Sequence, residues 1–263
     1  MNQSSLNLYT TFKQFAPNAF DQVTYDARAA LTIQGIQQTV PLLSRLSTLV
    51  TGRRLEVNFM RNFPQSQADR DSCAQLKKSL DHHGSDKANS HNYHLLYGTI
   101  LQERETIRNV FEFGLGTNNT KIMSNMGPGG RPGASMRGFR DFLPHAMIYG
   151  ADIDREILFS EERIETFYVD QTDPATFDEL LPSLPGEFDL IIDDGLHAPH
   201  ANLATLNFAL GKVRVGGWIV IEDISPAHTP IWEVASYLLP SRFESHFIMS
   251  VNNWLVFAVK RLA

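Results

Sequence analysis

The chain has 263 residues, of which 43% are hydrophobic and 20% charged, a composition typical of globular proteins. Its net charge of −6 argues against a broad basic surface for nucleic acid, and no apolar run reaches the length that crosses a bilayer. The single cysteine excludes an intramolecular disulfide and a cysteine-based zinc cluster. The first ten residues lack a signal-peptide pattern, so we expect a cytoplasmic protein that binds neither nucleic acid nor membrane.

The first 80 residues differ from the remainder and contain no chemical motif. Residues 27–50 carry apolar side chains at mostly helical spacing and predict a helix that is interrupted near Pro41. A short strand is expected at residues 55–59 and a polar helix at residues 66–80. We therefore expect residues 1–80 to form a helical cap, a substrate lid or a dimer surface, and the protein to be a homo-oligomer.

A histidine-rich segment follows at residues 82–97. Ser90 is placed to cap a helix that begins near His91. The histidines suggest a metal site, but no acid or cysteine stands at ligand spacing. A segment that lines the cofactor or substrate pocket is favoured instead, with Lys87 or Tyr93 meeting a carboxylate.

From residue 107 onward, apolar strands alternate with helical or loop segments. This alternation predicts an α/β domain over residues 81–263, with a doubly wound parallel sheet and a closing hairpin. The expected strands are residues 109–113, 146–151, 164–169, 188–192, 218–221, 243–251 and 254–259, and the expected helices are residues 134–143, 175–181, 198–213 and 229–238.

Acidic side chains follow the ends of four of these strands, and Glu112 lies inside the first strand, just before the turn Gly114–Gly116. The carboxyl ends of parallel strands meet at one edge of the sheet, where ligands bind. Clustered carboxylates repel one another unless cations or hydrogen-bond donors offset them, so this edge predicts a functional site. The acids are Asp152, Asp154, Asp170, Asp193, Asp194, Glu222 and Asp223.

The first part of this edge suits an adenosine cofactor. Glycine in the turn Gly114–Gly116 lets the backbone approach a ligand closely. An acid at the position of Asp152 takes ribose hydroxyls, with Asp154 as a helix cap, although Asp152 itself could be the cap. Asp170 and Gln171 are placed to meet the adenine, although Asp170 could also be a turn residue.

The second part of this edge suits a divalent cation. Asp193, Asp194, Glu222 and Asp223 offer the oxygen ligands that Mg²⁺ prefers. A bound Mg²⁺ lowers the pKa of a coordinated hydroxyl group, and His197 is suited to remove its proton near neutral pH. The alternative is that the acids cap helices and His197 is a surface residue.

The loop at residues 117–133 is long and rich in glycine and proline. Long loops in compact domains are usually functional or disordered. We expect an ordered flap over the cofactor, with Arg131 meeting an anionic group; the alternative is a flexible excursion.

As a set, these motifs resemble the class I S-adenosylmethionine-dependent methyltransferases. More narrowly, they are similar to the metal-dependent sugar O-methyltransferases of macrolide pathways, the mycinamicin and macrocin type. The resemblance covers residues 82–225. It rests on the segments Ser85–Lys87, His91–Tyr93, Glu112–Gly116, Gly133–Arg137, Tyr149–Asp154, Asp170–Gln171, Asp193–His197 and Gly216–Asp223.

The resemblance implies a Rossmann-like, seven-stranded sheet with a C-terminal antiparallel hairpin. It implies transfer of a methyl group from S-adenosylmethionine, assisted by Mg²⁺, to a hydroxyl group of a small molecule or sugar, either a natural product or a surface glycan. The implied catalytic residues are His197 as general base and Asp194, and the implied metal ligands are Asp194, Glu222 and Asp223. The implied cofactor-binding residues are Glu112, Gly114, Gly116, Ser135, Asp152, Ile153, Asp170, Gln171 and Asp193.

Two alternatives stay open. A nicotinamide-dependent dehydrogenase would need the turn Gly-x-Gly-x-x-Gly, which this chain lacks, and would leave the metal-suited acids without a role. A non-catalytic subunit that binds S-adenosylmethionine or a nucleotide could have kept the fold without the reaction.

Overall fold

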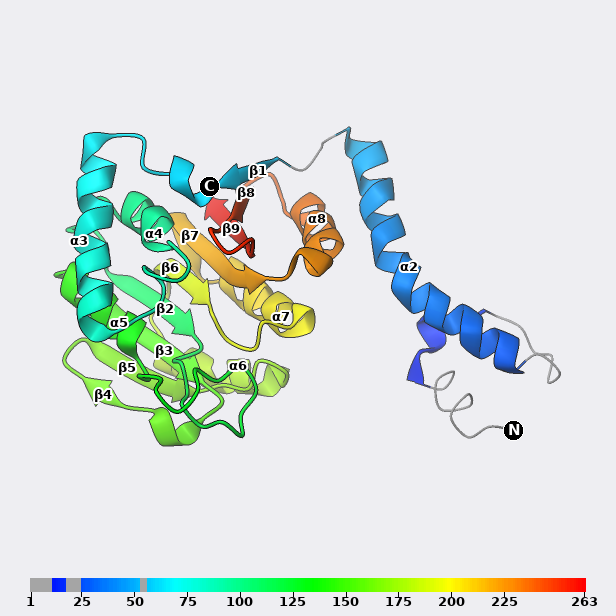
Figure 1. Cartoon of the computed structure of the whole chain (residues 1–263), viewed down its shortest axis with the longest axis horizontal. Coiled ribbons are helices and arrows are strands. Elements are labelled where there is room, and N and C mark those ends of the chain that lie inside the picture. Colours follow the sequence, from blue (N-terminus) through cyan, green and yellow to red (C-terminus); the bar gives the residue numbers. More distant parts are fainter. Residues whose placement is uncertain (1–10, 18–24, 53–55) are drawn as a thin grey trace. The chain divides into compact units, whose positions relative to one another are not determined.

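The structure is a computed structural model that describes residues 11–17, 25–52 and 56–263 (Figure 1). The segment without a signal-peptide pattern, residues 1–10, lies outside the described residues, as does the first residue of the strand predicted at 55–59.

The chain divides into two compact units. One is formed by residues 1–55 and 227–238, and the other by residues 56–226 and 239–263. The second unit contains the candidate site and the whole sheet.

The first unit is helical in its described residues, with η1 (Lys13–Phe15), α2 (Tyr25–Thr51) and α8 (Thr229–Leu238). The predicted interruption at Pro41 is wrong, because α2 continues through it. A proline removes one backbone hydrogen bond, and packing of α2 against α8 supports the helix on the C-terminal side of that point, where Thr48 and Tyr237 are hydrogen-bonded at 3.4 Å. None of the described helices is long and apolar enough to cross a membrane.

The second unit is built on one mixed sheet with the strand order β1-β8-β9-β7-β6-β2-β3-β5-β4. Strands β5, β3, β2, β6 and β7 are parallel, whereas β9 is antiparallel to both β7 and β8. The strands are β1 (Val57–Phe59), β2 (Asn109–Phe113), β3 (Met147–Asp152), β4 (Ser160–Glu161), β5 (Ile164–Tyr168), β6 (Phe188–Asp193), β7 (Val213–Ile224), β8 (Phe243–Met249) and β9 (Leu255–Arg261).

The described sheet therefore has nine strands, not the seven that the resemblance implied. The two additional strands extend its edges. The three-residue β1, close to the strand predicted at residues 55–59, pairs in parallel with β8, and the two-residue β4 pairs with β5. Such short strands cannot show the period-2 pattern by which longer strands are recognised.

Helices cover both faces of the sheet (Figure 1). α3 (Gln67–His83), α4 (His94–Ile100) and α5 (Ala134–Phe142) pack against one another on one face. On the other face, α6 (Pro174–Leu180) packs on β5, and α7 (Pro199–Leu210) packs on β6 and β7.

Successive side chains of a strand point to opposite faces of the sheet, so their position in the strand determines which helices they contact. On β2, Val110 belongs to the apolar core shared with α3, α4 and α5. Phe111 and Phe113 point the other way and contact the ring of Phe208 on α7. Glu112 follows the parity of Val110, so its carboxylate lies under the α3–α5 layer and not at the solvent edge.

The start of α4 differs from the prediction. α4 begins at His94 and is not capped by Ser90, so His91 lies outside the helix. The backbone cannot be helical earlier because Asn92 has a φ of 59°, in the left-handed region. In this position Nδ1 of His91 lies 3.4 Å from Asp223 Oδ1.

We predict that Gly98→Ala lowers the melting temperature. A Cβ at this position would lie 2.5 Å from the Cα of Cys73, so α3 and α4 would have to separate. Overpacking of this kind costs about 1–3 kcal/mol, or a fall in Tm of roughly 2–10 °C. Gly186→Ala is the matched control, since a Cβ there meets nothing within 4 Å. Equal melting temperatures for the two variants in calorimetry would contradict the prediction.

Candidate functional site

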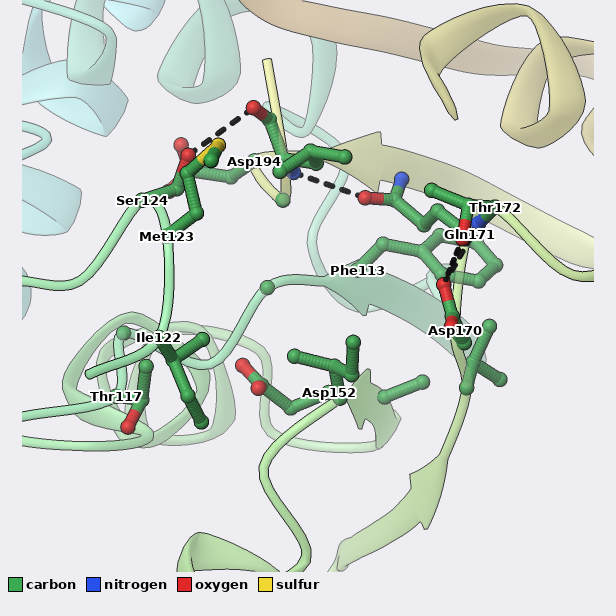
Figure 2. Close-up of a pocket in the computed structure, with 17 residues that line it drawn as sticks. Phe113, Thr117, Ile122, Met123, Ser124, Asp152, Asp170, Gln171, Thr172 and Asp194 are labelled. Atoms are coloured by element: carbon green, nitrogen blue, oxygen red, sulfur yellow. Dashed lines mark hydrogen bonds between the residues drawn. The ribbon is translucent and has the colours of Figure 1, made fainter. Parts of the chain in front are cut away.

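A pocket of about 720 Å³, partly open to solvent, lies at the carboxyl ends of β2, β3, β5 and β6 (Figure 2). Residues of the flap, Ile122 to Ser124, form one side, and Asp170 and Thr172 form the opposite side. The complete lining is Phe113, Gly114, Gly116, Thr117, Ile122, Met123, Ser124, Ala151, Asp152, Ile153, Val169, Asp170, Gln171, Thr172, Asp194, Gly195 and Leu196.

Glycine is required at the two positions of the turn for different physical reasons. Gly114 has a φ of 86°, and a Cβ there would lie 2.1 Å from the carbonyl oxygen of Asp194. It thus allows the end of β2 to approach the end of β6. Gly116 has a φ of 77°, and the nearest atom to its Cβ would be Cγ of Met126 at 3.2 Å. Both glycines line the pocket, and the close approach of this turn to a ligand stays a prediction.

Asp152 lines the pocket, and both of its carboxylate oxygens accept backbone hydrogen bonds. Oδ2 accepts from the Leu115 amide at 2.7 Å, and Oδ1 accepts from the Asp154 amide at 2.8 Å. Burial raises the pKa of Asp152, and these backbone donors oppose that rise. Ile153 lines the pocket beside it. Asp154 caps η4 (Arg155–Ile157) by accepting from the Glu156 amide, so its predicted role as a cap is confirmed.

Asp170 lines the pocket at the end of β5, and its Oδ1 accepts hydrogen bonds from the amide and hydroxyl of Thr172. Gln171 also lines the pocket, but its side-chain amide is bound to neighbouring protein groups. Its Nε2 donates to Asp193 Oδ1 at 2.8 Å and to Thr205 Oγ1 at 2.7 Å, and its Oε1 accepts from the Leu196 amide at 2.9 Å (Figure 2). The amide of Gln171 therefore positions the chain after β6.

Asp193 is fully buried and does not line the pocket. Oδ1 accepts from Gln171 and from the Gly195 amide at 3.2 Å, and Oδ2 accepts from Asn202 Nδ2 at 3.0 Å. Asp193 pairs with Phe113 across the sheet, so alternation directs it toward α7. The geometry gives it a positioning role.

The flap at residues 117–133 is an ordered turn structure over the pocket. The Met126 amide donates to the Thr117 carbonyl at 2.8 Å, and the Ser124 hydroxyl donates to the Leu196 carbonyl at 3.0 Å. Residues of this loop thus line one side of the pocket, and its role as an ordered flap over a cofactor stays a prediction. Arg131 does not line the pocket and packs against Gly84.

A buried lysine joins the acids of three strands on the α3–α5 face. Lys87 Nζ lies 2.5 Å from Asp194 Oδ2, 2.5 Å from Glu222 Oε2 and 3.2 Å from Glu112 Oε1. Burial alone would lower the pKa of the Lys87 ammonium, but the three carboxylates raise it well above its usual value. Lys87 is thus a fixed positive charge in the interior.

Two tyrosines of the same face hold further acids. Tyr97 Oη donates to Glu222 Oε1, and Tyr93 Oη donates to Asp223 Oδ1 at 2.5 Å. Burial raises the pKa of both phenols, so they remain donors. The sequence predicted that Lys87 or Tyr93 would meet a carboxylate, and both do.

Glu112 and Ser135, which the resemblance assigned to the cofactor, form the layer beneath the pocket. The Ser135 hydroxyl donates to Glu112 Oε2 at 2.6 Å, and neither residue lines the pocket. Burial raises the pKa of Glu112, and the positive charge of Lys87 opposes that rise.

Asp194, His197 and Asp223 form a half-exposed cluster next to the pocket, with one potential ligand atom from each residue lying within 4.8 Å of the other two. His197 Nε2 is 3.8 Å from Asp194 Oδ1. His197 and Asp223 have φ angles of 57° and 51°, a strained conformation that is most common at functional sites. Glu222, the third predicted metal ligand, is outside this cluster because Lys87 and Tyr97 occupy both of its oxygens.

The cluster is chemically suited to a divalent cation. Asp194 and Asp223 supply carboxylate oxygens, and His197 Nδ1 is a buried atom without a hydrogen-bond partner. Sequence reasoning missed the central place of Lys87. The segment Ser85–Lys87 was part of the resemblance, but only the fold reveals which acids it meets.

Comparison with known proteins agrees with this geometry. Residues 133–224 match the family described as a methyltransferase domain. The chain is 28% identical over 154 residues to 8-demethyl-8-alpha-L-rhamnosyl tetracenomycin-C 2'-O-methyltransferase of Streptomyces olivaceus, covering 58% of this chain and 38% of that protein. It is 41% identical over 99 residues to mycinamicin VI 2''-O-methyltransferase of Micromonospora griseorubida, covering 37% of this chain and 24% of that protein. These matched stretches therefore span well under half the length of the relatives.

The fold has a counterpart among solved structures. The MycE methyltransferase of the mycinamycin biosynthetic pathway, solved with Mg and SAH, superposes with a TM-score of 0.56 at 23% identity, covering 72% of this chain and 53% of that chain. This likeness confirms the Rossmann-like α/β fold. The sequence matches confirm the resemblance to class I S-adenosylmethionine-dependent methyltransferases, and the match to the methyltransferase domain covers residues 133–224.

We predict that Lys87→Met destabilises the second unit strongly. It leaves the buried carboxylates of Glu112 and Glu222 without their cation, which costs about 3–5 kcal/mol and lowers Tm by roughly 6–20 °C. Lys77→Met is the matched control, because Lys77 pairs with Asp81 at the surface. Adding Glu112→Gln to Lys87→Met should recover part of the loss. Thermal denaturation with equal Tm values for the Lys87 and Lys77 variants would contradict this account.

Proposed function

We propose that this chain transfers the methyl group of S-adenosylmethionine to a hydroxyl group of a sugar or another small molecule, with the help of Mg²⁺. One observation carries the proposal: Asp194 borders both the large pocket and the cluster with His197 and Asp223. A methyl donor in the pocket and a hydroxyl group at the cluster would then meet at the same residue.

The pocket supports an adenosine-type ligand. Asp152 offers carboxylate oxygens to ribose hydroxyls, and Asp170 stands at the next strand end, where it can accept from an adenine amino group. The exposed side chain of Ile153 supplies an apolar wall for the base. Gln171 and Asp193 hold the backbone of Leu196 and Gly195, whereas Glu112 and Ser135 are hydrogen-bonded to each other beneath the pocket.

The cluster supports binding of Mg²⁺ through Asp194 and Asp223, and Glu222 holds Lys87 behind them. When bound, Mg²⁺ would polarise the acceptor hydroxyl and lower its pKa. Because Mg²⁺ prefers oxygen ligands, the imidazole of His197 is left to act as general base. The MycE structures, which contain Mg, support the Mg²⁺ part of this proposal for a protein of the same fold.

The proposed reaction follows from the positions of these residues. His197 takes the proton of the acceptor hydroxyl, and the acceptor oxygen attacks the methyl carbon in line with the departing sulfur. The carbon–sulfur bond breaks as the carbon–oxygen bond forms, so a methyl ether and S-adenosylhomocysteine result. Lys87, Tyr93 and Tyr97 fix the carboxylates around this point, which supports catalysis by positioning and electrostatics.

Relatives indicate the acceptor class. Their names specify 2'-O-methylation of a rhamnosyl tetracenomycin, 2''-O-methylation of mycinamicin VI and 3-O-methylation of L-olivosyl-oleandolide. A deoxysugar hydroxyl on a natural product is therefore the acceptor we favour, with a surface glycan as the alternative. We further propose that residues 1–80 act as cap, lid or dimer surface and that the protein is a homo-oligomer.

Isothermal titration tests the cofactor proposal. We expect S-adenosylhomocysteine to bind, and Asp152→Asn to weaken its binding roughly 10- to 100-fold, by loss of one charge-assisted hydrogen bond of about 1.5–3 kcal/mol. The Tm of the ligand-free variant must be measured as well, because Asp152 also accepts from Leu115. Absence of S-adenosylhomocysteine binding to the wild-type chain would overturn the proposed function.

A methyl-transfer assay tests the role of His197 as general base. With rhamnosyl and olivosyl glycosides as acceptors and S-adenosylhomocysteine release as the measurement, we expect His197→Ala to lower kcat about 10²- to 10⁴-fold. Its affinity for S-adenosylhomocysteine should stay close to wild type. His145→Ala is the control, because His145 is exposed and pairs with Glu105. Full activity of His197→Ala would exclude this residue as the base.

A further inference from the structure

The first unit has almost no apolar core of its own. Among its described residues, only Trp232 and Ala235 of α8 are both apolar and buried. A helix in a protein gains most of its stability from packing of an apolar face, not from its own backbone. The 27-residue helix α2 therefore needs apolar contacts that the described part of this unit does not supply.

The large apolar side chains near the C-terminal end of α2 lie on its outside instead. Five of them are exposed by 46% to 76%, and their spacing of three or four residues places them within about 120° of the helix circumference. Ser44 and Thr48, which bind side chains of α8, point to the opposite side of the helix. The exposed set, called the leucine ridge below, is Leu42, Leu43, Leu46, Leu49 and Val50.

The same face of α2 is covered nearer its N-terminal end. Gly35 lies on this face and packs against η1, where a Cβ on Gly35 would lie 2.5 Å from the carbonyl oxygen of Phe15. Thr32, also on this face, is fully buried. Burial of this face thus ends where the leucine ridge begins.

The leucine ridge carries no charge. Among the side chains described at residues 27–51, Arg28 and Arg45 are the charged ones; Arg28 is buried and Arg45 flanks the ridge. Helices that lie on a membrane surface carry many lysines and arginines on their polar face, and this helix exposes one. A contiguous apolar patch without charges is instead typical of the core of an interface between protein chains.

The spacing within the leucine ridge points to a second copy of this chain as the partner. Its other members stand three and four residues before and after Leu46. Two antiparallel helices run through their sequences in opposite directions, so a symmetric spacing is complementary to itself, as an interface with two-fold symmetry requires. Leu46 then meets its own counterpart, Leu42 packs beside Leu49 of the other copy, and Leu43 packs beside Val50.

We propose that the leucine ridge is an interface between two copies of this chain, paired antiparallel around Leu46. The ridge would bury roughly 400 Å² of apolar surface per copy, at about 80 Å² per side chain. Because about 65% of a homodimer interface is apolar, the whole contact would bury about 1,200 Å², which is enough for a specific interface. This inference narrows the homo-oligomer proposed above and does not depend on methyl transfer.

Sedimentation velocity of the full chain tests the pairing. We expect the wild-type chain to have a mass at least twice 29.6 kDa, and Leu46→Glu to halve that mass. Two carboxylates would face each other in an apolar contact, which should raise the dissociation constant at least about 100-fold. Leu262→Glu is the matched control and should keep the wild-type mass, because Leu262 is a similarly exposed leucine (49%) of the second unit.

Cysteine cross-linking keeps the test decisive if Leu46→Glu also lowers the helix content. The native Cys73 is buried, so a disulfide between chains reports the introduced thiol. Leu46→Cys should form a disulfide-linked dimer under mild oxidation, because the two copies of residue 46 meet at the two-fold axis. Gln37→Cys is the control and should stay unlinked, since Gln37 is exposed on the opposite side of the same helix.

The outcomes separate this interface from the proposed function. A monomeric wild-type chain, an assembly whose mass Leu46→Glu leaves unchanged, or equal cross-linking of the two cysteine variants would overturn the interface. The large pocket lies in the second unit, so Leu46→Glu should bind S-adenosylhomocysteine as the wild-type chain does. Absence of that binding in the wild-type chain would remove the proposed function and leave the interface standing.

Discussion

The contact on which the site depends is the ammonium group of Lys87 between the carboxylates of Glu112, Asp194 and Glu222. Each acid comes from the carboxyl-terminal end of a different strand, so one cation joins β2, β6 and β7. Without it, three carboxylates would be brought together out of water, where their mutual repulsion and desolvation favour protonation or unfolding. The same contact anchors the segment before α4 to the sheet. This segment also carries His91 and Tyr93, and Tyr97 follows on α4 itself.

Side chains alternate between the two faces of a strand, and this alternation separates the acids into two groups. One group holds other residues of the site in place, and the other is open to a ligand. Glu112 and Glu222 lie on the α3–α5 face. Lys87 and Tyr97 bind both oxygens of Glu222, and Ser135 binds one oxygen of Glu112, whose other oxygen lies 3.2 Å from Lys87 Nζ. Asp193, one face over, is saturated by Gln171 and Asn202. Only at the edge itself, where the strands end, do Asp194 and Asp223 keep partial exposure. A residue at the carboxyl end of a strand is thus not automatically a ligand-binding residue. The face of the sheet to which its side chain points determines whether it can reach a ligand.

The sequence predicted the alternating core strands and the acids that follow them, because these depend on local pattern and on the general topology of parallel sheets. It could not predict that Lys87 meets three acids, since two of them lie more than 100 residues away in the sequence. It also misjudged the start of α4, because a single left-handed residue, Asn92, overrides the capping potential of Ser90. The interruption at Pro41 was predicted from the chemistry of proline alone, whereas packing against α8 maintains α2 in the adjoining turns.

The structure also differs from the sequence-based predictions in the roles of the motif residues. Gly114 makes room for the carbonyl of Asp194, Gln171 and Ser124 hydrogen-bond the two backbone groups of Leu196, and Asp193 binds the amide of Gly195. The glycine turn, the flap and the end of β5 all hold one short segment, residues 194–197. Its first three residues line the large pocket, and its last, His197, lines a neighbouring hollow. The pocket and the neighbouring hollow therefore share a single stretch of backbone, and the same contacts that shape the pocket wall position His197.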